Sequence, residues 1–186
     1  MDTLVRDPFF THMAPFFGLE FEELLAQKHP TTWLEFELGQ IGEDQLSTRF
    51  FRDGRHIDGA ALKERMRTAY EWIDGMEPLL RDLQARDVAM HLLSNYPEWY
   101  RLCDERLGVF RYVEPSFVSC KTGVRKPAPE AYLHACRALD LTPAQCLFID
   151  DREPNCAAAR ALEMDSVRFD GDVTRLRAEL ERRRLL

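Results

Sequence analysis

The stretch Cys146-Leu147-Phe148-Ile149-Asp150-Asp151 decides the fold. Its apolar part is typical of a strand buried in a sheet, and its acidic part stands where that strand ends. Two adjacent carboxylates at the end of a buried strand repel each other and are costly to place there. A divalent cation relieves this repulsion, and oxygen ligands suit magnesium. A helix N-cap explains one of the carboxylates but not both, so we predict a metal site at Asp150 and Asp151.

Outward from this stretch, strands and helices alternate from about residue 74 onward. The strand-like runs lie at residues 88–94, 116–120, 145–149 and 165–169. The helical runs lie at residues 78–86, 98–107, 129–139, 155–162 and 173–184. This alternation predicts an α/β fold, with a parallel sheet and helices on its faces. In such sheets the chemistry lies beyond the carboxyl ends of the strands, so the polar residues at those ends are the candidates.

The earlier part of the chain has a different pattern. Residues from about 9 to 74 contain no strand-like run. An apolar run lies at 11–17, and helical spacing of apolar residues recurs at 21–25, 32–38, 43–51 and 58–72. Pro30 and Gly39 bracket the second of these spaced segments. Short helices joined by tight turns predict a compact helical subdomain.

Two further strand ends carry polar residues. Ser94-Asn95 follows the apolar run 88–93, where a hydroxyl and backbone N–H groups bind phosphate oxygens well. The alternative is a plain turn, because Ser, Asn and the nearby Pro97 are turn formers. Lys126 stands just before a helix that starts at Pro129, where a lysine adds to an anion site. The alternative for Lys126 is an ordinary surface cation.

The combination is more specific than its parts, because Ser-Asn, Lys-Pro and Asp-Asp occur in this order on successive strand–helix units. It resembles the haloacid dehalogenase-like (HAD) superfamily, with Ser94, Lys126 and Asp150-Asp151 matching its second, third and fourth motifs. The matching segments are residues 125–132 and 148–151. The resemblance implies a Rossmann-like core, residues 1–11 and 74–186, with a small helical cap inserted at residues 12–73. Residues 1–9, 28–31 and 95–100 further resemble the plant and algal flavin mononucleotide hydrolase-like branch of this family.

The resemblance also implies a mechanism and a set of roles. In the family an aspartate attacks the phosphoryl group, and water then hydrolyses the phospho-aspartate. Ser94 and Lys126 are the catalytic candidates, and Ser94, Asn95 and Lys126 are expected to bind the substrate phosphate. Asp150 and Asp151 are expected to hold Mg²⁺. Asp151 is the direct ligand in this interpretation, and Asp150 acts through water or by supporting the ligands.

One motif departs from the family pattern. The first motif reads Asp-x-Asp-x-Thr, and Thr3 matches its threonine. The acid/base aspartate then falls on Met1, and the nucleophile falls before the first residue of this chain. We therefore expect the central strand of the sheet and the nucleophile to lie outside these residues, in an N-terminally truncated but otherwise active enzyme. The alternative is a catalytically inactive binding or regulatory relative that keeps its affinity for phosphate and metal.

The composition of the chain argues against some classes of binding partner. Among 186 residues, Lys and Arg number 25 and Asp and Glu 32, so the net charge is −7. This charge disfavours nucleic acid and anionic membrane surfaces as partners. No apolar run reaches the about 18 residues that a membrane-spanning helix needs. The cysteine count is odd, at five, and no CxxC pair occurs, which favours a reducing compartment, either the cytoplasm or the chloroplast stroma.

The expected activity is hydrolysis of a small phosphorylated metabolite, with flavin mononucleotide (FMN) favoured by the resemblance. The helical part offers aromatic side chains for a flavin ring, or these side chains form its own core. They are Phe16, Phe17, Trp33, Phe36, Phe50, Phe51, Tyr70 and Trp72. A dehalogenase is the competing hydrolase on this fold. The family's dehalogenases do not need magnesium, so Asp150-Asp151 argues against this alternative. The sequence does not indicate an oligomeric state.

Overall fold

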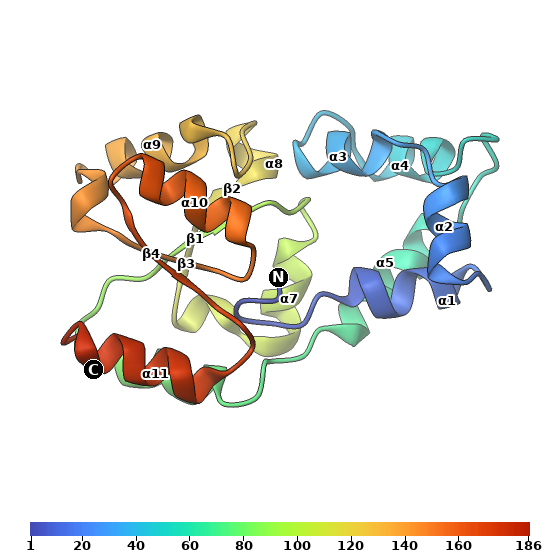
Figure 1. Ribbon diagram of the computed structural model, residues 1–186. Coiled ribbons are helices and arrows are strands. Elements are labelled where there is room, and N and C mark those ends of the chain that lie inside the picture. The colour runs from blue at the N-terminus through green and yellow to red at the C-terminus, as the bar shows by residue number, and fades with distance from the viewer.

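The computed structural model describes residues 1–186, and its first part is helical. Figure 1 shows helices α1–α5 together at one side of the molecule. A π-helical turn, η1 (Phe9–Met13), leads into α1 (Ala14–Phe16), α2 (Phe21–Gln27), α3 (Thr32–Glu37), α4 (Glu43–Arg49) and α5 (Gly59–Ala69). These helices match the apolar spacing of the sequence. This part contains no β-strand, and its residues form one isolated β-bridge with each other, between Lys28 and Phe51.

The second part alternates strands and helices as predicted. Its elements are α6 (Met76–Gln84), β1 (His91–Ser94), α7 (Tyr100–Leu107), η2 (Val109–Arg111), β2 (Glu114–Val118), α8 (Ser119–Thr122), α9 (Pro129–Ala138), η3 (Pro143–Gln145), β3 (Leu147–Asp150), α10 (Glu153–Ala161), β4 (Asp165–Arg168) and α11 (Val173–Arg182). The predicted strand 116–120 ends early, at Val118, because Ser119 begins α8. The predicted strand 88–94 begins late, at His91, because the Val88 N–H donates to the Leu83 carbonyl and prolongs the end of α6.

Local sequence signals explain where several helices begin. Asp58 caps α5 by accepting a hydrogen bond from the Ala61 N–H, at 2.9 Å. Asp172 caps α11 in the same way. Proline stands in the first turn of α9 and α10, where its missing N–H is not needed. These signals place the helices that follow β3 and β4, and so fix where the strands end.

The strands form two separate parallel pairs. β1 pairs with β2, and β3 pairs with β4, so β1 and β3 each have one unpaired edge. A mostly apolar cavity of about 490 Å³ is lined by every residue of both β1 and β3. Because successive residues of a strand point to opposite faces, a cavity that meets them all lies along the strand edges and not on one face. The expected parallel sheet is therefore divided by a gap between β1 and β3.

Most of the predicted core residues are buried. Of the eight aromatic side chains singled out in the sequence of the helical part, five are buried: Trp33, Phe36, Phe50, Phe51 and Tyr70. They confirm the interpretation that these rings form the core of the helical part. All cysteines are free thiols, and Cys103, Cys136 and Cys156 are buried. None of the helices is both long and apolar enough to cross a membrane.

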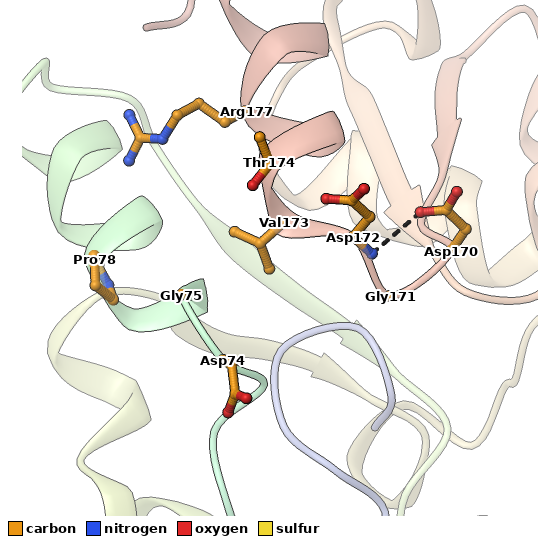
Figure 2. Close-up of a pocket in the computed structure, with 9 residues that line it drawn as sticks. All are labelled: Asp74, Gly75, Pro78, Asp170, Gly171, Asp172, Val173, Thr174 and Arg177. Carbon is orange, nitrogen blue, oxygen red and sulfur yellow. Dashed lines mark hydrogen bonds between the residues drawn. The ribbon is translucent and has the colours of Figure 1, made fainter.

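Two short segments connect the helical part to the rest, side by side. Val5 forms an antiparallel bridge with Trp72. The Arg6 N–H donates to the Glu71 carbonyl at 2.9 Å, and the Ile73 N–H donates to the Leu4 carbonyl at 3.1 Å. Close to this crossing, an open pocket of about 710 Å³ lies between the starts of α6 and α11 (Figure 2). It contains none of the predicted site residues, so it is not the candidate site.

Candidate active site

The predicted site residues come together at the carboxyl ends of β1 and β3. Ser94 ends β1, Asp150 ends β3, and Lys126 lies in the loop before α9. Ser94, Lys126 and Asp150 line the same cavity between the two strand pairs. The Lys126 Nζ atom lies 2.6 Å from Asp150 Oδ2, and the two side chains are only 9% and 4% exposed. Lys126 is therefore part of a buried ion pair and not a surface cation.

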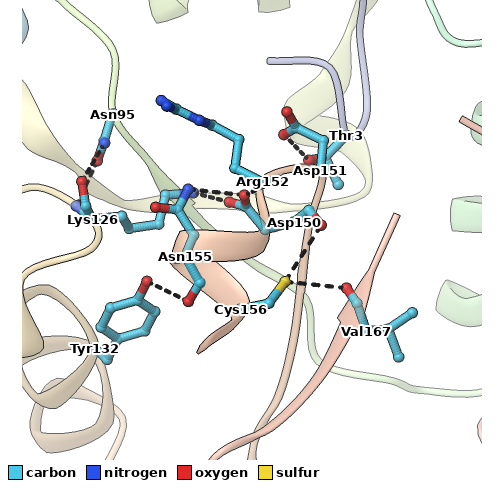
Figure 3. Close-up of polar contacts among 10 residues, drawn as sticks. All are labelled: Thr3, Asn95, Lys126, Tyr132, Asp150, Asp151, Arg152, Asn155, Cys156 and Val167. Atoms are coloured by element: carbon cyan, nitrogen blue, oxygen red, sulfur yellow. Dashed lines mark hydrogen bonds and ion pairs between the residues drawn. The ribbon is translucent and has the colours of Figure 1, made fainter. Parts of the chain in front are cut away.

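The Asp150 carboxylate is held in place by contacts to both of its oxygens (Figure 3). Its Oδ2 accepts from Lys126, and its Oδ1 accepts from the Arg152 N–H and from Asn155 Nδ2, both at 2.9 Å. Burial raises the pKa of Asp150, but the Lys126 ammonium and these hydrogen bonds outweigh burial, so the pKa lies below its usual range. The carboxylate is held ionised, with both oxygens engaged by the protein.

Asp151 is in the opposite situation. Its Oδ1 accepts a hydrogen bond from Thr3 Oγ1 at 3.1 Å, and its side chain is partly exposed (Figure 3). No cation of the protein pairs with it. The chain gathers no group of three or more His, Cys, Asp or Glu side chains that would by itself hold a metal ion. Asp151 is thus the open carboxylate of the site, and it offers one ligand to a cation.

Asn95 fixes the loop that carries Lys126. Its Nδ2 donates to the Lys126 carbonyl, and its Oδ1 accepts from the Lys126 N–H, each at 2.8 Å. Both polar atoms of the side chain are therefore used on the main chain of Lys126 (Figure 3). This pairing positions Lys126, a role that the sequence alone did not indicate. Substrate binding by Asn95 stays a prediction.

A second contact brings the helical part to this loop. Arg125 Nη2 lies 2.9 Å from Glu37 Oε2, and Trp33 Nε1 donates to Glu37 Oε1 at 2.9 Å. Ser119 Oγ donates to the Glu37 carbonyl at 2.5 Å. Burial raises the pKa of Glu37, and the Arg125 guanidinium opposes this shift. The end of α3 therefore lies against the loop of Lys126, a contact with no signal in the sequence.

Comparison with known proteins identifies the family to which this protein belongs. The chain matches the model of the haloacid dehalogenase-like hydrolases over residues 15–163, and it belongs to this family. The predicted family, the α/β fold and the hydrolase class are confirmed.

Individual proteins of this family are also similar to the chain. The chain is 44% identical over 170 residues to flavin mononucleotide hydrolase 1 of Arabidopsis thaliana, a chloroplast protein. The matched residues make up 91% of this chain and 69% of that protein. It is 31% identical over 140 residues to the sesquiterpene phosphatase astK of Aspergillus oryzae, covering 72% of this chain and 69% of that protein. Among solved structures it resembles a variant of the HAD family enzyme bt-2542 of Bacteroides thetaiotaomicron, in complex with magnesium and inorganic phosphate. The TM-score is 0.75, the sequences are 20% identical, and the match covers 94% of each chain. At this identity the comparison shows a shared fold.

Proposed function

We propose that this protein is a Mg²⁺-dependent phosphomonoesterase that acts on a small phosphorylated metabolite through a phospho-aspartate. The observation that carries the proposal is the buried Lys126–Asp150 pair beside the open Asp151, at the ends of two parallel strands. A buried ion pair is weak evidence for stability alone, and perturbed ionisable groups gather at functional sites. A fixed cation stabilises the charge on a phosphoryl group during its transfer, and a carboxylate without a cationic partner can hold the metal ion that assists this transfer.

Lys126 supplies the positive charge in this proposal. Its ammonium has three N–H donors, and Asp150 takes one of them. The remaining donors are available to the phosphoryl oxygens, together with the Ser94 hydroxyl. They stabilise the charge that builds up on these oxygens in the transition state. Asp150 and Asn95 act through Lys126, since one orients its ammonium and the other holds its main chain.

Mg²⁺ fits Asp151 better than Asp150. Asp151 has a partly exposed carboxylate that no protein cation neutralises, whereas both oxygens of Asp150 already accept hydrogen bonds. We assign Asp151 as a direct ligand and Asp150 to a supporting role, through water or through its neighbours. The bound ion would neutralise charge on the phosphoryl group. One carboxylate does not complete a magnesium site, so other ligands join Asp151.

The nucleophile is proposed to lie on a strand that fills the gap between β1 and β3. Both flanking edges are unpaired, the cavity between them is mostly apolar, and its polar end is formed by Thr3, Ser94, Lys126 and Asp150. A parallel strand placed there pairs with both neighbours and ends at that polar group. An aspartate at its end meets Lys126 directly. Residues 12–73 form the cap over this site in the same proposal.

FMN is the substrate that we test first, because a relative that covers most of this chain is named for its hydrolysis. The cytoplasm and the chloroplast stroma are the proposed locations. The buried aromatic rings of the helical part serve its core and do not argue for a flavin. Substrate choice therefore rests on the relative, and the chemistry rests on the strand ends.

The test is phosphate release by the protein together with the strand proposed to fill the gap between β1 and β3, with Mg²⁺ or with a chelator. FMN and other small phosphomonoesters are supplied, and release is expected only with Mg²⁺. Lys126→Met should lower kcat by about 100-fold or more, by analogy with the loss of one preorganised donor. The matched control is Lys121→Met, which removes an exposed lysine. Binding of phosphate and Mg²⁺ without any turnover would instead establish the inactive binding protein.

A further inference from the structure

The carboxyl end of α3 lies against the loops that carry the site residues. Figure 1 shows α3 beside α8, the short helix that follows β2. The hydroxyl of Ser119, the first residue of α8, donates to the Glu37 carbonyl at 2.5 Å and accepts from the Tyr96 N–H at 3.0 Å. Ser119 is buried. It therefore joins the last residue of α3 to the loop that follows Ser94.

A glycine allows this close approach. Gly39 has a φ of +67°, in the left-handed region that favours glycine. A Cβ atom at this position would overlap the carbonyl oxygen of Cys120 in α8. The main chains of the helical part and of α8 therefore meet with no side chain between them.

A buried tryptophan completes the contact from the other side. Trp99 lies in the loop between β1 and α7, and its ring centroid is 5.2 Å from that of Phe36 and 6.0 Å from that of Trp33, both on α3. Its Nε1 donates to Oε1 of Glu43, the first residue of α4, at 2.9 Å. Buried aromatic rings contribute strongly to such contacts. The helical part is therefore seated on the rest of the molecule in a defined position.

One ion pair in this contact reaches the loop of Lys126. Arg125 precedes Lys126 in the chain, and its Nη2 lies 2.9 Å from Glu37 Oε2. The Glu37 side chain is 13% exposed and that of Arg125 is 36% exposed, so the pair is only partly screened by water. The other oxygen of Glu37 accepts from Trp33 Nε1. Glu37 thus connects α3 to the residue next to Lys126.

Glu37 is the only hydrogen-bond partner of the Arg125 side chain in the structure. The Arg125 Nε atom is buried and has no acceptor. A buried N–H group without an acceptor costs free energy, which an arginine turned towards solvent avoids. Arg125 therefore keeps this position because of the Glu37 carboxylate, although the position leaves one of its donors unpaired.

The loop between α8 and α9, residues 123–128, is held from two sides. On the strand side, Asn95 binds the main chain of Lys126. On the helical side, Glu37 binds the side chain of Arg125. Inside the loop, the Ala128 N–H donates to the Arg125 carbonyl at 3.0 Å. Because Arg125 and Lys126 share a peptide bond, a shift of one moves the other, and a small shift of a catalytic group lowers the rate strongly.

We propose that Glu37 is a positioning residue for Lys126, an inference that rests on the proposed function. Through Arg125, Glu37 makes the alignment of the Lys126 ammonium depend on the seating of α3. When α3 lifts, Arg125 loses its partner and Asn95 alone holds the loop. Phosphoryl transfer therefore proceeds when the helical part is seated. Glu37 itself touches no reacting atom.

The first test is hydrogen exchange of the loop, followed by mass spectrometry, which needs no catalysis. Glu37→Gln keeps the length of the side chain but turns an N–H₂ group towards a donor that the carboxylate accepted. The peptide that contains the amides of Lys126 and Ala128 should exchange about 10-fold faster than in wild type, because a hydrogen bond to a charged group is lost.

The matched control is Glu35→Gln, the same change on the same helix. Glu35 pairs with Arg49 at 2.7 Å, and both residues belong to the helical part. The exchange of residues 123–128 should therefore stay at the wild-type rate in this variant. Melting curves of each variant check that it is folded.

The second test is phosphate release from FMN with Mg²⁺, by the protein together with the strand proposed to fill the gap between β1 and β3. Glu37→Gln should lower kcat by about 10- to 100-fold with little change in KM, whereas Glu35→Gln should keep the wild-type kcat. Arg125→Gln should show the same loss as Glu37→Gln, and the double variant should lose no more, because both residues act through one contact. If Glu37→Gln does not fold, Arg125→Gln carries both comparisons, since it leaves the helical part unchanged.

Three results would overturn the inference separately from the proposed function. If wild type releases phosphate and Glu37→Gln changes neither the exchange of the loop nor kcat, Glu37 does not position Lys126. If Glu37→Gln lowers only the melting temperature, its role is structural. If the losses in kcat add up in the double variant, Glu37 and Arg125 act separately. If wild type releases no phosphate, the proposed function fails, and the exchange comparison still decides whether Glu37 holds the loop.

Discussion

Replacing Lys126 with methionine tests whether the buried ion pair is built into the fold. The side chains of Lys126 and Asp150 are 9% and 4% exposed, and their charged atoms lie 2.6 Å apart. Methionine is similar in length and fills the same space without the charge. The substitution leaves the Asp150 carboxylate buried, with only the Arg152 N–H and Asn155 on its other oxygen.

Removing one partner of a buried ion pair destabilises a protein by about 3–5 kcal/mol. We expect the lower end, about 3 kcal/mol, because hydrogen bonds remain on Asp150 and because its carboxyl group can take up a proton. With an m-value of about 2–3 kcal/mol/M in urea, this loss lowers the midpoint of unfolding by about 1–1.5 M. The control Glu64→Gln breaks a pair with Arg67 at the protein surface and should leave the midpoint nearly unchanged.

The assay is urea unfolding at neutral pH, followed by circular dichroism, for a double-mutant cycle. The cycle contains Lys126→Met, Asp150→Asn and the double variant. The double variant should be more stable than the sum of the single losses predicts, because it leaves no unpaired buried charge. Additive losses, or a loss below about 1 kcal/mol for Lys126→Met, would refute the coupling of the two side chains.

The pH dependence of the same variant gives a second test. The pKa of Asp150 is lower in the folded protein than its ordinary value of 3.8. Its contribution to the free energy of unfolding is therefore present above that value and is lost as the pH falls through the folded-state pKa. Lys126→Met lacks this contribution. The stability difference between wild type and Lys126→Met should shrink as the pH falls below 3.8.

Three further predictions concern neighbouring residues. Asp151→Asn should abolish both Mg²⁺ binding, measured by calorimetry with Mg²⁺ alone, and Mg²⁺-dependent phosphate release; unchanged binding would move the metal elsewhere. Asn95→Ala should lower the free energy of unfolding by about 1–3 kcal/mol, because the buried main-chain groups of Lys126 lose their partners, and should lower kcat; wild-type values for both would contradict its positioning role. Asp7→Asn should raise the melting temperature at pH 7, because the folded state raises the pKa of Asp7, and the gain should vanish below the ordinary value of 3.8.

The sequence predicts the elements well, because strand and helix patterns are local. Apolar runs bounded by polar residues mark the strands, and those polar residues lie at the strand ends where the structure brings them together. The boundaries are less accurate where a tertiary contact decides them. Ser119 follows an apolar run but begins a helix, and its hydroxyl contacts both Glu37 and the Tyr96 N–H.

The contacts that hold the site residues in place could not be predicted from the sequence. Asn95 pairs with a main chain 31 positions away, and Glu37 pairs with Arg125, 88 positions away. Residue type and spacing indicate the chemistry of a site, whereas the groups that orient it depend on the packed fold.

The most direct test of the phospho-aspartate mechanism is to locate the phosphoryl group during turnover. The protein, together with the strand proposed to fill the gap between β1 and β3, is mixed with FMN and Mg²⁺, quenched in acid, digested and examined by mass spectrometry. We predict one phosphoryl group on an aspartate of the segment that fills the gap between β1 and β3. Phosphate release with no phosphorylated aspartate, or with the phosphoryl group on Ser94, would contradict the mechanism.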